Sequence, residues 1–501
     1  MSNKESHCPW QTYLRDFPLR LPVLLALALL AMLLFHGSRG LYETTEGRYA
    51  ECAREMAQTG TWLEPVLNGR PHWTKPPLTY LAIRLPYMAL GPTTWAARLY
   101  LIPCFLATVA AVWWLAFRLW GDRPSARMSA MVYATTVTPL MSSQAVSTDC
   151  LLTATLAVAQ ALFWEGLRNR SRLALHLLWL CMGVAFLVKG PPALLALPAF
   201  LVVWLHQPRE LRKRVPLFAP TAIALFLAVG LSWYVLEVWR HPGLLGYWLK
   251  EEVVDRSFTD KFSRNPYFYC NFTIYLPILL FGSLPWIGWL ALRWREVWAR
   301  VRLTGGLRQM WTAWPDEAHW LVWAVVLPLA VFMSSRSKLP LYVLPLFVPL
   351  AAATGRLLMA TYGRETWFGK RALATVCAVY VVFVAGKGVV AFLPQEKDMG
   401  QLHRTLTERY GVRDSSRLAV LVNRPLNGLS FYYDTVLTNV SLNELAGWAN
   451  AGGTRFLLCD HGKVDEAKAM LGGRTADVQV LSRRRRLLRI EGPVPAADSK
   501  R

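Results

Sequence analysis

Long apolar runs are the feature that most constrains the fold of this chain of 501 residues. A helix crosses the hydrocarbon core of a bilayer in roughly 20 residues, and runs of this kind recur as far as about residue 390. The first, Leu21–Leu34, is followed by charged residues rather than by a small-residue cleavage site. We therefore interpret it as a retained membrane helix and not as a removable signal peptide.

Hydropathy predicts an α-helical polytopic membrane protein with about 11–13 transmembrane helices. The fifth and sixth predicted spans are short, and the segment Lys189-Gly190-Pro191-Pro192 lies between them. Proline and glycine at membrane depth interrupt a helix, so we expect a break there. Eleven segments carry the prediction, centred near Leu27, Phe105, Val132, Ala157, Trp179, Ala199, Leu225, Leu280, Val325, Val348 and Val382.

The short basic loops predict the orientation of these helices. Lysine and arginine concentrate in cytoplasmic loops. With the N-terminus inside, every strongly basic short loop falls on that side, from Arg118/Arg123/Arg127 to Arg356/Arg364/Lys370/Arg371. The outer side then receives two long loops, 37–92 and 241–271, and an odd number of helices also places the C-terminal region outside.

The composition changes near residue 393. Long apolar runs give way to short ones such as Leu418–Val422 and Arg455–Cys459, with helical stretches between them. This alternation predicts a small soluble α/β domain, 393–501, after a transmembrane domain, 1–392. Within it, the run Arg483–Arg486 has two interpretations that the sequence does not separate: a lipid-headgroup contact or a strand edge guarded by charge.

Charge and cysteine usage exclude other classes. The net charge of +23 lies mostly in short loops between apolar runs, so it encodes topology rather than a nucleic-acid-binding face. The 8 cysteines are scattered without a CxxC pair, which argues against a zinc or redox motif.

The first outer loop carries the densest polar motif. The stretch Glu46–Met56 has helical spacing and is strongly polar, with Glu46 and Arg48 at its start and Glu43 just before it. A solvated helix at the membrane surface, held by ion pairs three residues apart, would explain the charge alone.

Lysines beside prolines mark further candidate sites on the same face. Lys75 precedes Pro76-Pro77 on a stiff, extended backbone, which suits a fixed ammonium for an anion such as phosphate; contact with lipid headgroups is the alternative. Lys189 lies at a proline break inside the membrane, where an ionisable residue indicates function. Asp149 opens the fourth helix and could be only a helix-start residue.

Together these residues form a cationic set with nearby carboxylates. Cations would hold a lipid phosphate, and a carboxylate would take a proton from an attacking hydroxyl. This layout is the one expected for sugar transfer from a polyprenyl-phosphate donor. The cations are Lys75, Lys189, Arg264, Arg336 and Lys338, and the carboxylates are Glu43, Glu46, Asp149 and Asp255.

The order and spacing of several motifs resemble the bacterial lipid-linked-sugar glycosyltransferases of GT-C type. The resemblance covers about Leu41 to Leu350. The sequence is similar in particular to the aminoarabinose transferases of lipid A and to the protein O-mannosyltransferases. The matching pieces are Glu46-Gly-Arg-Tyr-Ala-Glu51, Asn68-Gly69, Lys75-Pro-Pro77, Lys189-Gly-Pro191, Arg264-Asn-Pro266, Leu284-Pro-Trp286 and Lys338-Leu-Pro340 with Tyr342.

The resemblance implies inverting transfer from an undecaprenyl-phosphate sugar at the periplasmic face of the inner membrane. It implies that Lys75 and Arg264 hold the carrier phosphate with Tyr342 nearby, and that a first-loop carboxylate acts as the base. We assign Glu46, Glu43 and Asp149 to catalysis. Substrate binding is assigned to Lys75, Arg264, Tyr342, Lys338, Arg48 and Lys189.

Two departures from the family pattern matter. The family often has Asp-Glu where this chain has Thr45-Glu46, so Glu46 or Glu43 would have to serve as the base. Aminoarabinose transferases place a Glu before the lysine and a His before the loop arginine, positions associated with a metal; here they are Thr74 and Ser263. We therefore expect no metal there and no cofactor, and a relative acting on another sugar or acceptor.

The partners expected from these features are a polyprenyl-phosphate-linked sugar donor and a lipid, glycan or protein acceptor, with no nucleic acid. The alternative function is a transporter or flippase of a lipid-linked sugar or anionic lipid. Transporters often show inverted repeats and a site at mid-membrane; this chain shows no such repeat and carries its charged motifs in loops. An O-antigen ligase or polymerase is a third reading that the first-loop and Lys-Pro-Pro motifs do not favour.

Overall fold

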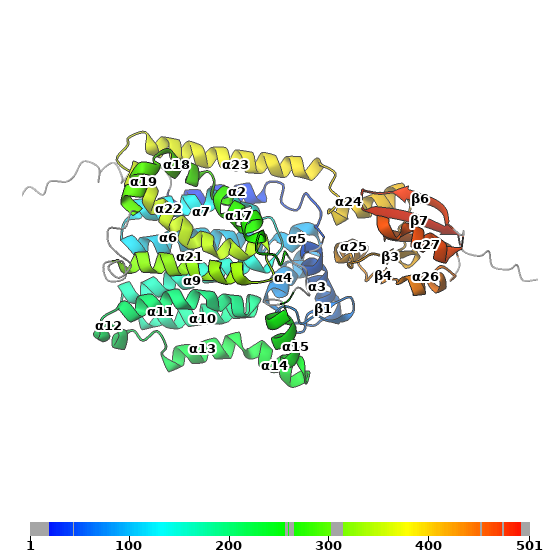
Figure 1. The fold of residues 1–501 in the computed structure, drawn as a ribbon, viewed down its shortest axis with the longest axis horizontal. Coiled ribbons are helices and arrows are strands. Elements are labelled where there is room, and N and C mark those ends of the chain that lie inside the picture. The colour runs from blue at the N-terminus through cyan, green and yellow to red at the C-terminus, as the bar shows by residue number, and fades with distance from the viewer. Residues whose placement is uncertain are drawn as a thin grey trace, which may run out of the picture. The chain divides into compact units, whose positions relative to one another are not determined.

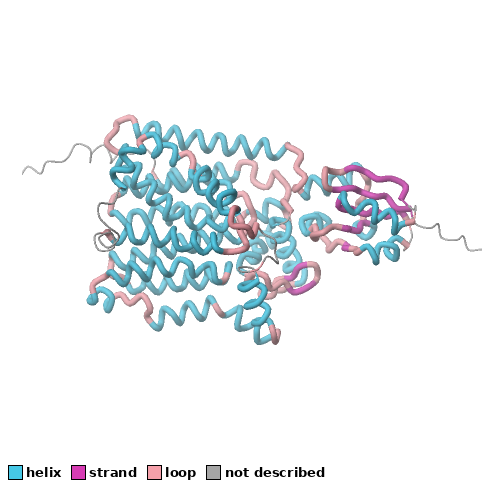
Figure 2. The backbone as a smooth tube through the Cα atoms, viewed as in Figure 1, coloured by secondary structure: helices cyan, strands magenta, loops and turns pink. Residues whose placement is uncertain are grey.

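The computed structural model describes residues 20–43, 45–255, 259, 265–301, 314–450, 453–472 and 475–491. Helices dominate it, and strands are confined to a short hairpin and one sheet near the C-terminus (Figures 1 and 2). The chain divides into two compact units. The first unit comprises Met1–His36, Trp73–Ala82 and Arg98–Gly388; the second comprises Gly37–His72, Ile83–Ala97 and Val389–Arg501.

Six helices in the described residues are long and apolar enough to cross a membrane. Two further pairs of helices would each make one bent span: Pro220–Gly230 with Ser232–Arg240 at 47°, and Asn271–Ser283 with Trp286–Leu292 at 77°. The six are Thr94–Trp120 (α5 and α6), Thr148–Arg168 (α9), Arg172–Lys189 (α10), Asp316–Ser334 (α21), Pro340–Tyr362 (η5 and α22) and Phe368–Phe392 (α23). The chain is therefore a polytopic membrane protein.

All eleven predicted segments fall on helices, but six, or eight with the bent pairs, meet the length and hydropathy of a span. The helix α2 (Leu21–Leu33) and the stretch Pro191–His206 (η1 and α11) are apolar but shorter. Helix α7 (Arg123–Thr135) has 13 residues and starts in polar sequence, where Asp122 accepts a hydrogen bond from Ser125 N. Hydropathy windows do not register where helices stop, so they do not distinguish these shorter helices from the six long ones.

The other helices of the first unit are short, and they include the members of the two bent pairs. The predicted break after α10 is present: Gly190 adopts φ 73°, and the chain continues as the 3₁₀ helix η1. These short helices are α8 (Val137–Ser142), α12 (Arg209–Arg214), α13 (Pro220–Gly230), α14 (Ser232–Arg240), α15 (Leu244–Tyr247), η2 (Trp248–Asp255), η3 (Asn271–Tyr275), α17 (Leu276–Leu280), η4 (Phe281–Ser283), α18 (Trp286–Leu292) and α19 (Trp294–Val301).

Small residues let α7 and α22 (Phe347–Tyr362) touch backbone to backbone. A Cβ added at Gly355 would lie 2.5 Å from Ser129 N and 2.6 Å from Ser129 Cα. Ser129 Oγ also bonds Ala352 O at 3.2 Å. Since lipid tails give no hydrophobic drive for helices to associate, such close packing is what holds membrane helices together.

Gly355→Val is therefore expected to destabilise the protein by about 1–3 kcal/mol, the usual cost of overpacking a close contact. The matched control is Gly386→Val in α23, where an added Cβ meets nothing within 4 Å. Thermal unfolding in detergent should show a lower midpoint for Gly355→Val alone. Equal midpoints for the two variants would contradict the packing of α7 against α22.

The second unit contains a five-stranded sheet with strand order β4-β3-β5-β7-β6. Strand β3 is parallel to β4 and β5, whereas β7 is antiparallel to both β5 and β6. The predicted small α/β fold is thus present. The strands are β3 (Leu418–Leu421), β4 (Thr438–Asn439), β5 (Thr454–Asp460), β6 (Thr475–Val480) and β7 (Arg485–Glu491).

Helices cover both faces of this sheet. Alternate strand residues point to opposite faces, so Ala419 and Leu457 join one buried cluster while Leu418 and Leu458 join another. The first cluster contains residues of α26 (Leu442–Ala449) and α27 (Val464–Leu471); the second contains residues of α24 (Met399–Arg404), η6 (Thr405–Arg409) and α25 (Asn427–Tyr433).

Most of the first predicted outer loop folds into the second unit, whereas its part Trp73–Ala82 belongs to the first unit. The stretch predicted as a helix, Glu46–Met56, lies in α3 (Thr45–Thr59), and the hairpin of β1 (Val66–Leu67) and β2 (Arg70–Pro71) follows. Tyr42 forms an isolated bridge with Asp398. Met399 N also bonds Leu41 O at 3.0 Å. Residues about 350 positions apart in the sequence therefore build one compact unit.

Candidate functional site

Lys189, Asp149 and Tyr342 meet in the first unit, although three separate parts of the sequence supply them. Helix α10 ends at Lys189, and Asp149 lies in the first turn of α9 behind the capping residue Ser147. The Lys189 ammonium forms an ion pair with the Asp149 carboxylate and lies 4.4 Å from the ring centre of Tyr342. Both charged side chains are about 90% buried, which makes this a fixed cation and not a mobile surface lysine.

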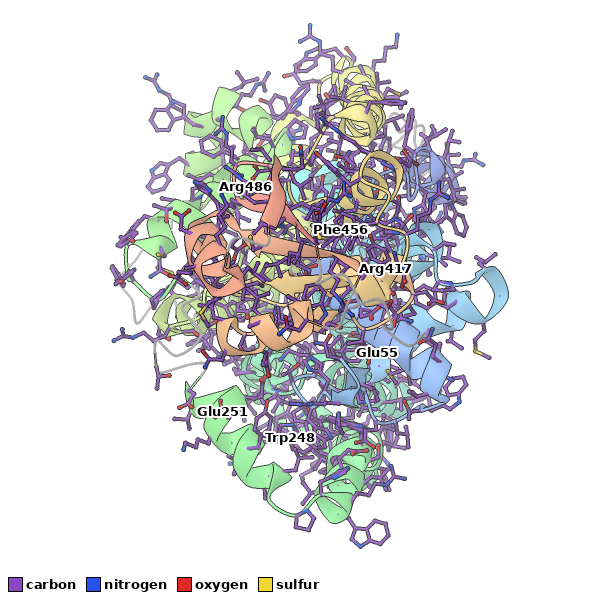
Figure 3. All side chains as sticks on the ribbon, turned by 90° about the vertical axis from the view of Figure 1, so that its right-hand side faces the viewer. Glu55, Trp248, Glu251, Arg417, Phe456 and Arg486 are labelled. Carbon is purple, nitrogen blue, oxygen red and sulfur yellow. The ribbon has the colours of Figure 1, made fainter. Side chains whose placement is uncertain are left out.

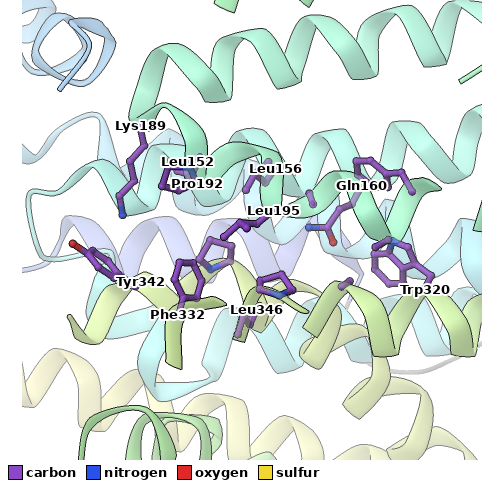
Figure 4. A pocket seen from close by; sticks show the side chains of 16 residues that line it. Leu152, Leu156, Gln160, Lys189, Pro192, Leu195, Trp320, Phe332, Tyr342 and Leu346 are labelled. Carbon is purple, nitrogen blue, oxygen red and sulfur yellow. The ribbon is translucent and has the colours of Figure 1, made fainter. Parts of the chain in front are cut away.

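An apolar pocket begins at this ion pair. Its lining comes from α9, α10, η1, α11, α21 and η5, and Lys189 and Tyr342 lie together at one end (Figure 4). Gln160 and Trp320 lie at the other end, where Gln160 Oε1 and Trp320 Nε1 have no hydrogen-bond partner among the described residues. Leucine, proline, alanine and phenylalanine side chains make up the wall between the two ends.

Lys338 is a buried cation just before η5 (Pro340–Leu346). Its side chain is 2% exposed, and Nζ donates to Ser335 O at 2.5 Å. Burial lowers the pKa of Lys338, and the neighbouring Arg336 lowers it further. Asn265 Nδ2 donates to Lys338 O at 3.0 Å, so the Asn265-Pro266 end of the second long loop contacts the Lys-Leu-Pro turn.

Lys75 is also paired within the first unit. Its Nζ lies 3.0 Å from Glu252 Oε2 and 2.7 Å from Thr74 O. The two charged side chains are 16% and 12% exposed. The second long loop packs beside it, because Trp248 Nε1 donates to Trp73 O at 2.8 Å. The predicted fixed ammonium before Pro76 is therefore held by a carboxylate.

Glu46 is held by an arginine in the second unit. Arg39 donates to both carboxylate oxygens of Glu46, at 2.6 and 2.9 Å, and Tyr42 N donates to Oε2 at 2.9 Å. Arg48, two residues further along α3, is half-buried with its guanidinium 5.5 Å from the ring centre of Tyr49. Glu46 is thus an ion-paired carboxylate that fixes the start of α3.

Glu43 has a different environment in the same unit. Its Oε2 accepts a hydrogen bond from Gly428 N at 2.8 Å, and its Oε1 is buried without a hydrogen-bond partner among the described residues. Burial raises the pKa of Glu43 to about 7, against the opposing influence of the Gly428 bond, Arg485 and Arg48. A carboxylate that changes protonation near neutral pH is suited to proton transfer.

The structure thus groups the predicted residues into sets. Asp149, Lys189 and Tyr342 form one cluster in the first unit, where Lys75 and Lys338 have their own partners. Glu43, Glu46 and Arg48 lie in the second unit. Arg264 falls outside the described residues.

Sequence reasoning missed two residues that hold predicted ones. Glu252 pairs with Lys75, and Arg39 pairs with Glu46. Arg39 lies seven residues before its partner, but Glu252 lies 177 residues after Lys75. An acid in the second predicted outer loop was the signal available for Glu252, since the topology places both loops on one face.

Comparison with known proteins finds similarity to sugar transferases that use a lipid carrier. A family model described as dolichyl-phosphate-mannose-protein mannosyltransferase matches residues 20–247. An undecaprenyl phosphate-alpha-4-amino-4-deoxy-L-arabinose arabinosyl transferase of Erwinia tasmaniensis is 30% identical over 364 residues, 71% of this chain and 61% of that protein. A similarly named protein of Sodalis glossinidius is 32% identical over 340 residues, 67% of this chain and 58% of that protein. The alignments thus span about six-tenths of these relatives' length.

Solved structures share the fold across nearly the whole chain. The crystal structure of ArnT from Cupriavidus metallidurans bound to undecaprenyl phosphate superposes with a TM-score of 0.73 at 18% identity, covering 95% of this chain and 99% of that one. The Archaeoglobus fulgidus oligosaccharyltransferase superposes with a TM-score of 0.55 at 9% identity, over 90% of this chain and 71% of that one. This chain is therefore a multi-pass inner-membrane protein with a GT-C-like fold, and its sequence is similar to the lipid-carrier-dependent glycosyltransferases, in particular the undecaprenyl-phosphate aminoarabinose transferases.

Proposed function

We propose that this protein transfers a sugar from a polyprenyl-phosphate donor, of the undecaprenyl-phosphate kind, to an acceptor such as lipid A, a glycan or a protein. The reaction would take place at the periplasmic face of the inner membrane, the side that the basic loops leave outside. The named relatives, which are undecaprenyl-phosphate aminoarabinose transferases, support this class of reaction.

The observation that carries the proposal is an apolar pocket with a buried ammonium at one end. An isoprenoid chain needs an apolar wall, which the pocket supplies, and its phosphate needs a cation, which Lys189 supplies beside Tyr342. An ammonium can donate to more than one acceptor at once, so the bond to Asp149 is compatible with a phosphate at the same nitrogen.

The transfer would proceed by attack of the acceptor oxygen on the anomeric carbon of the donor sugar. The bond between that carbon and the carrier phosphate oxygen breaks, and the phosphate leaves with the electron pair. Lys75 and Lys189, with Arg264 and Lys338, would stabilise the charge that develops on the phosphate. Because the donor brings its own phosphate leaving group, we propose no metal and no cofactor.

A carboxylate would take the proton when the acceptor is a hydroxyl. We infer that Glu43 fits this role better than Glu46. Glu43 changes protonation near pH 7 and has a buried oxygen that makes no hydrogen bond within the described chain, whereas Glu46 holds two bonds from Arg39. Asp149 is engaged by Lys189 and would act by holding that cation in place.

The experiment that tests the function uses the purified chain in detergent with radiolabelled undecaprenyl-phosphate sugars and a cell-envelope extract as acceptor, with and without chelator. Label should move to an acceptor from one donor and be insensitive to the chelator. If instead no donor gives transfer and lipid-linked sugar crosses vesicle membranes containing the protein, the transferase proposal is wrong and the flippase alternative is right.

The double change Lys189→Met with Asp149→Asn is expected to raise the donor KM roughly ten- to hundredfold. A hydrogen bond to a charged group is worth about 1.5–3 kcal/mol, and the paired change avoids leaving a buried unpaired carboxylate. Initial rates against donor concentration measure the effect. An unchanged donor KM in a folded double variant would show that Lys189 does not hold the carrier phosphate.

A further inference from the structure

The turn between β6 and β7 carries four consecutive arginines, Arg483–Arg486. The turn is ordered by its own hydrogen bonds, because Ser482 Oγ accepts from the backbone N–H groups of Arg484 and Arg485, each at 3.2 Å. We call Ser482–Arg486 the arginine turn. Its internal bonds hold the arginines at a fixed place on the sheet.

The arginine turn lies at the end of the sheet where β3 and β5 finish, which we call the carboxyl end of these two strands. Asp460, the last residue of β5, is the pairing partner of Arg485, and His461 N donates to Arg484 O at 2.7 Å. The loop after β3 reaches the same carboxyl end, since Asn423 N donates to Asp460 Oδ2 at 3.1 Å. The cations near the carboxyl end of β3 and β5 are Arg424, Lys463, Arg483, Arg484 and Arg486.

These cations outnumber the carboxylates beside the turn, which are Asp460, Glu396 and Glu43, the last of them facing the half-buried Arg485. All three acids accept backbone N–H bonds, Glu396 from Arg483 at 2.8 Å and Glu43 from Gly428 at 2.8 Å. The side chains of Arg483 and Arg484 are exposed and form no ion pair within the described residues. The arginine turn and its neighbours therefore present a net positive surface to solvent.

The hydrogen bond from Arg483 N to Glu396 places the arginine turn close to a membrane. Glu396 follows Phe392, the end of the spanning helix α23, by four residues. Phe392 is 83% exposed and Leu393 is 49% exposed, as expected of side chains that face lipid. Four residues reach roughly 14 Å at most when fully extended. The Glu396 side chain and its 2.8 Å bond to Arg483 N add to this, so the Arg483 backbone lies within roughly 22 Å of the end of α23.

A guarded strand edge does not explain these arginines. Charge on an edge strand blocks pairing with another chain, but the edge strands of this sheet are β4 and β6. Arg485 and Arg486 lie on β7, which is paired on both sides by β5 and β6. Positive charge at this turn protects no free edge.

We propose that the arginine turn binds the phosphate-bearing headgroups of anionic lipids in the leaflet where α23 ends. Basic residues near an anionic membrane surface each add a favourable contribution of about a factor of five in affinity. Guanidinium groups also bind phosphate through two parallel hydrogen bonds. The contact would fix the sheet of the second unit to the membrane surface.

The test measures lipid binding to the full chain in detergent by native mass spectrometry, with phosphatidylglycerol and phosphatidylcholine of the same acyl chains. The test variant is Arg483→Ser with Arg484→Ser. The matched control is Arg413→Ser with Arg417→Ser, two exposed arginines that precede β3 at the opposite end of its strand. Figure 3 labels Arg486 and Arg417 with Phe456 of the sheet between them.

The test variant should bind phosphatidylglycerol roughly 25-fold more weakly, about fivefold per arginine, with phosphatidylcholine binding unchanged. The control should match the wild type, and Arg483→Lys with Arg484→Lys should keep most of the affinity because it keeps the charge. Equal losses in test and control variants would overturn the proposal. Displacement of phosphatidylglycerol by millimolar inorganic phosphate would also overturn it, because the site would then bind a free anion.

Discussion

Lys75→Ala is expected to lower the rate of sugar transfer by roughly 10²–10³-fold, the usual loss when one fixed donor to a developing negative charge is removed. The ammonium is held on the rigid Lys-Pro-Pro segment and is only 16% exposed, so its position is set before the donor binds. Initial rates with saturating donor and acceptor measure the effect.

The partner of Lys75, Glu252, makes it possible to separate a loss of catalysis from a loss of stability. Lys75 and Glu252 form a partly buried ion pair, and removing one partner of a buried pair destabilises a protein. Lys75→Ala combined with Glu252→Gln removes the unpaired charge and should restore the thermal midpoint without restoring transfer. Glu252→Gln alone should retain transfer, since Lys75 remains. If the single changes at both positions lowered the rate equally, Lys75 would serve only the ion pair.

The membrane fold could be predicted from the sequence because its signals are local. Apolar runs long enough for a bilayer, and the break at Gly190, each depend on a few neighbouring residues. The number of spans was less predictable. The ends of α2 and of α7 depend on capping and on packing against neighbours, and hydropathy does not record either of these.

The candidate site residues could be proposed individually from the sequence, but their partners could not. Lys189 and Asp149 were each recognised from a proline break and a helix start, but no local signal joined them into a buried ion pair. The same holds for Lys75, whose partner lies on another loop 177 residues away. Spacing within one element predicts a neighbour, whereas contacts between elements depend on the whole fold.

The environment of Glu43 was the least predictable feature. Its oxygen meets Gly428, 385 residues later in the chain, because the first outer loop and the C-terminal sheet build one unit. The sequence favoured Glu46, backed by Asp149, as the base and offered Glu43 as the alternative. Only the folded unit distinguishes them, by pairing Glu46 with Arg39 and leaving Glu43 buried away from an ion pair.

Glu43→Gln should lower kcat by roughly 10²–10⁴-fold with a hydroxyl acceptor, which is the usual contribution of a general base. In the wild type the rate should rise with pH through about 7, because burial raises the pKa of Glu43 to about 7 and only the ionised carboxylate accepts a proton. This limb of the pH–rate profile should be absent in the variant. A phosphate acceptor is already ionised, so its transfer should depend little on Glu43.

The stability of the protein provides a second measurement of the same group. Since the folded pKa of Glu43 lies above its ordinary value of 4.5, the protonated form is favoured by folding. That stabilisation is complete below about pH 4.5 and is lost as pH rises to about 7. Thermal midpoints of wild type relative to Glu43→Gln should therefore fall across this window and then level off. If the midpoints follow this course while the variant keeps the wild-type pH–rate profile with a hydroxyl acceptor, Glu43 is a structural carboxylate and another group is the base. Glu46→Gln is the comparison variant, because it breaks the Arg39 pair and should leave the limb near pH 7 in place.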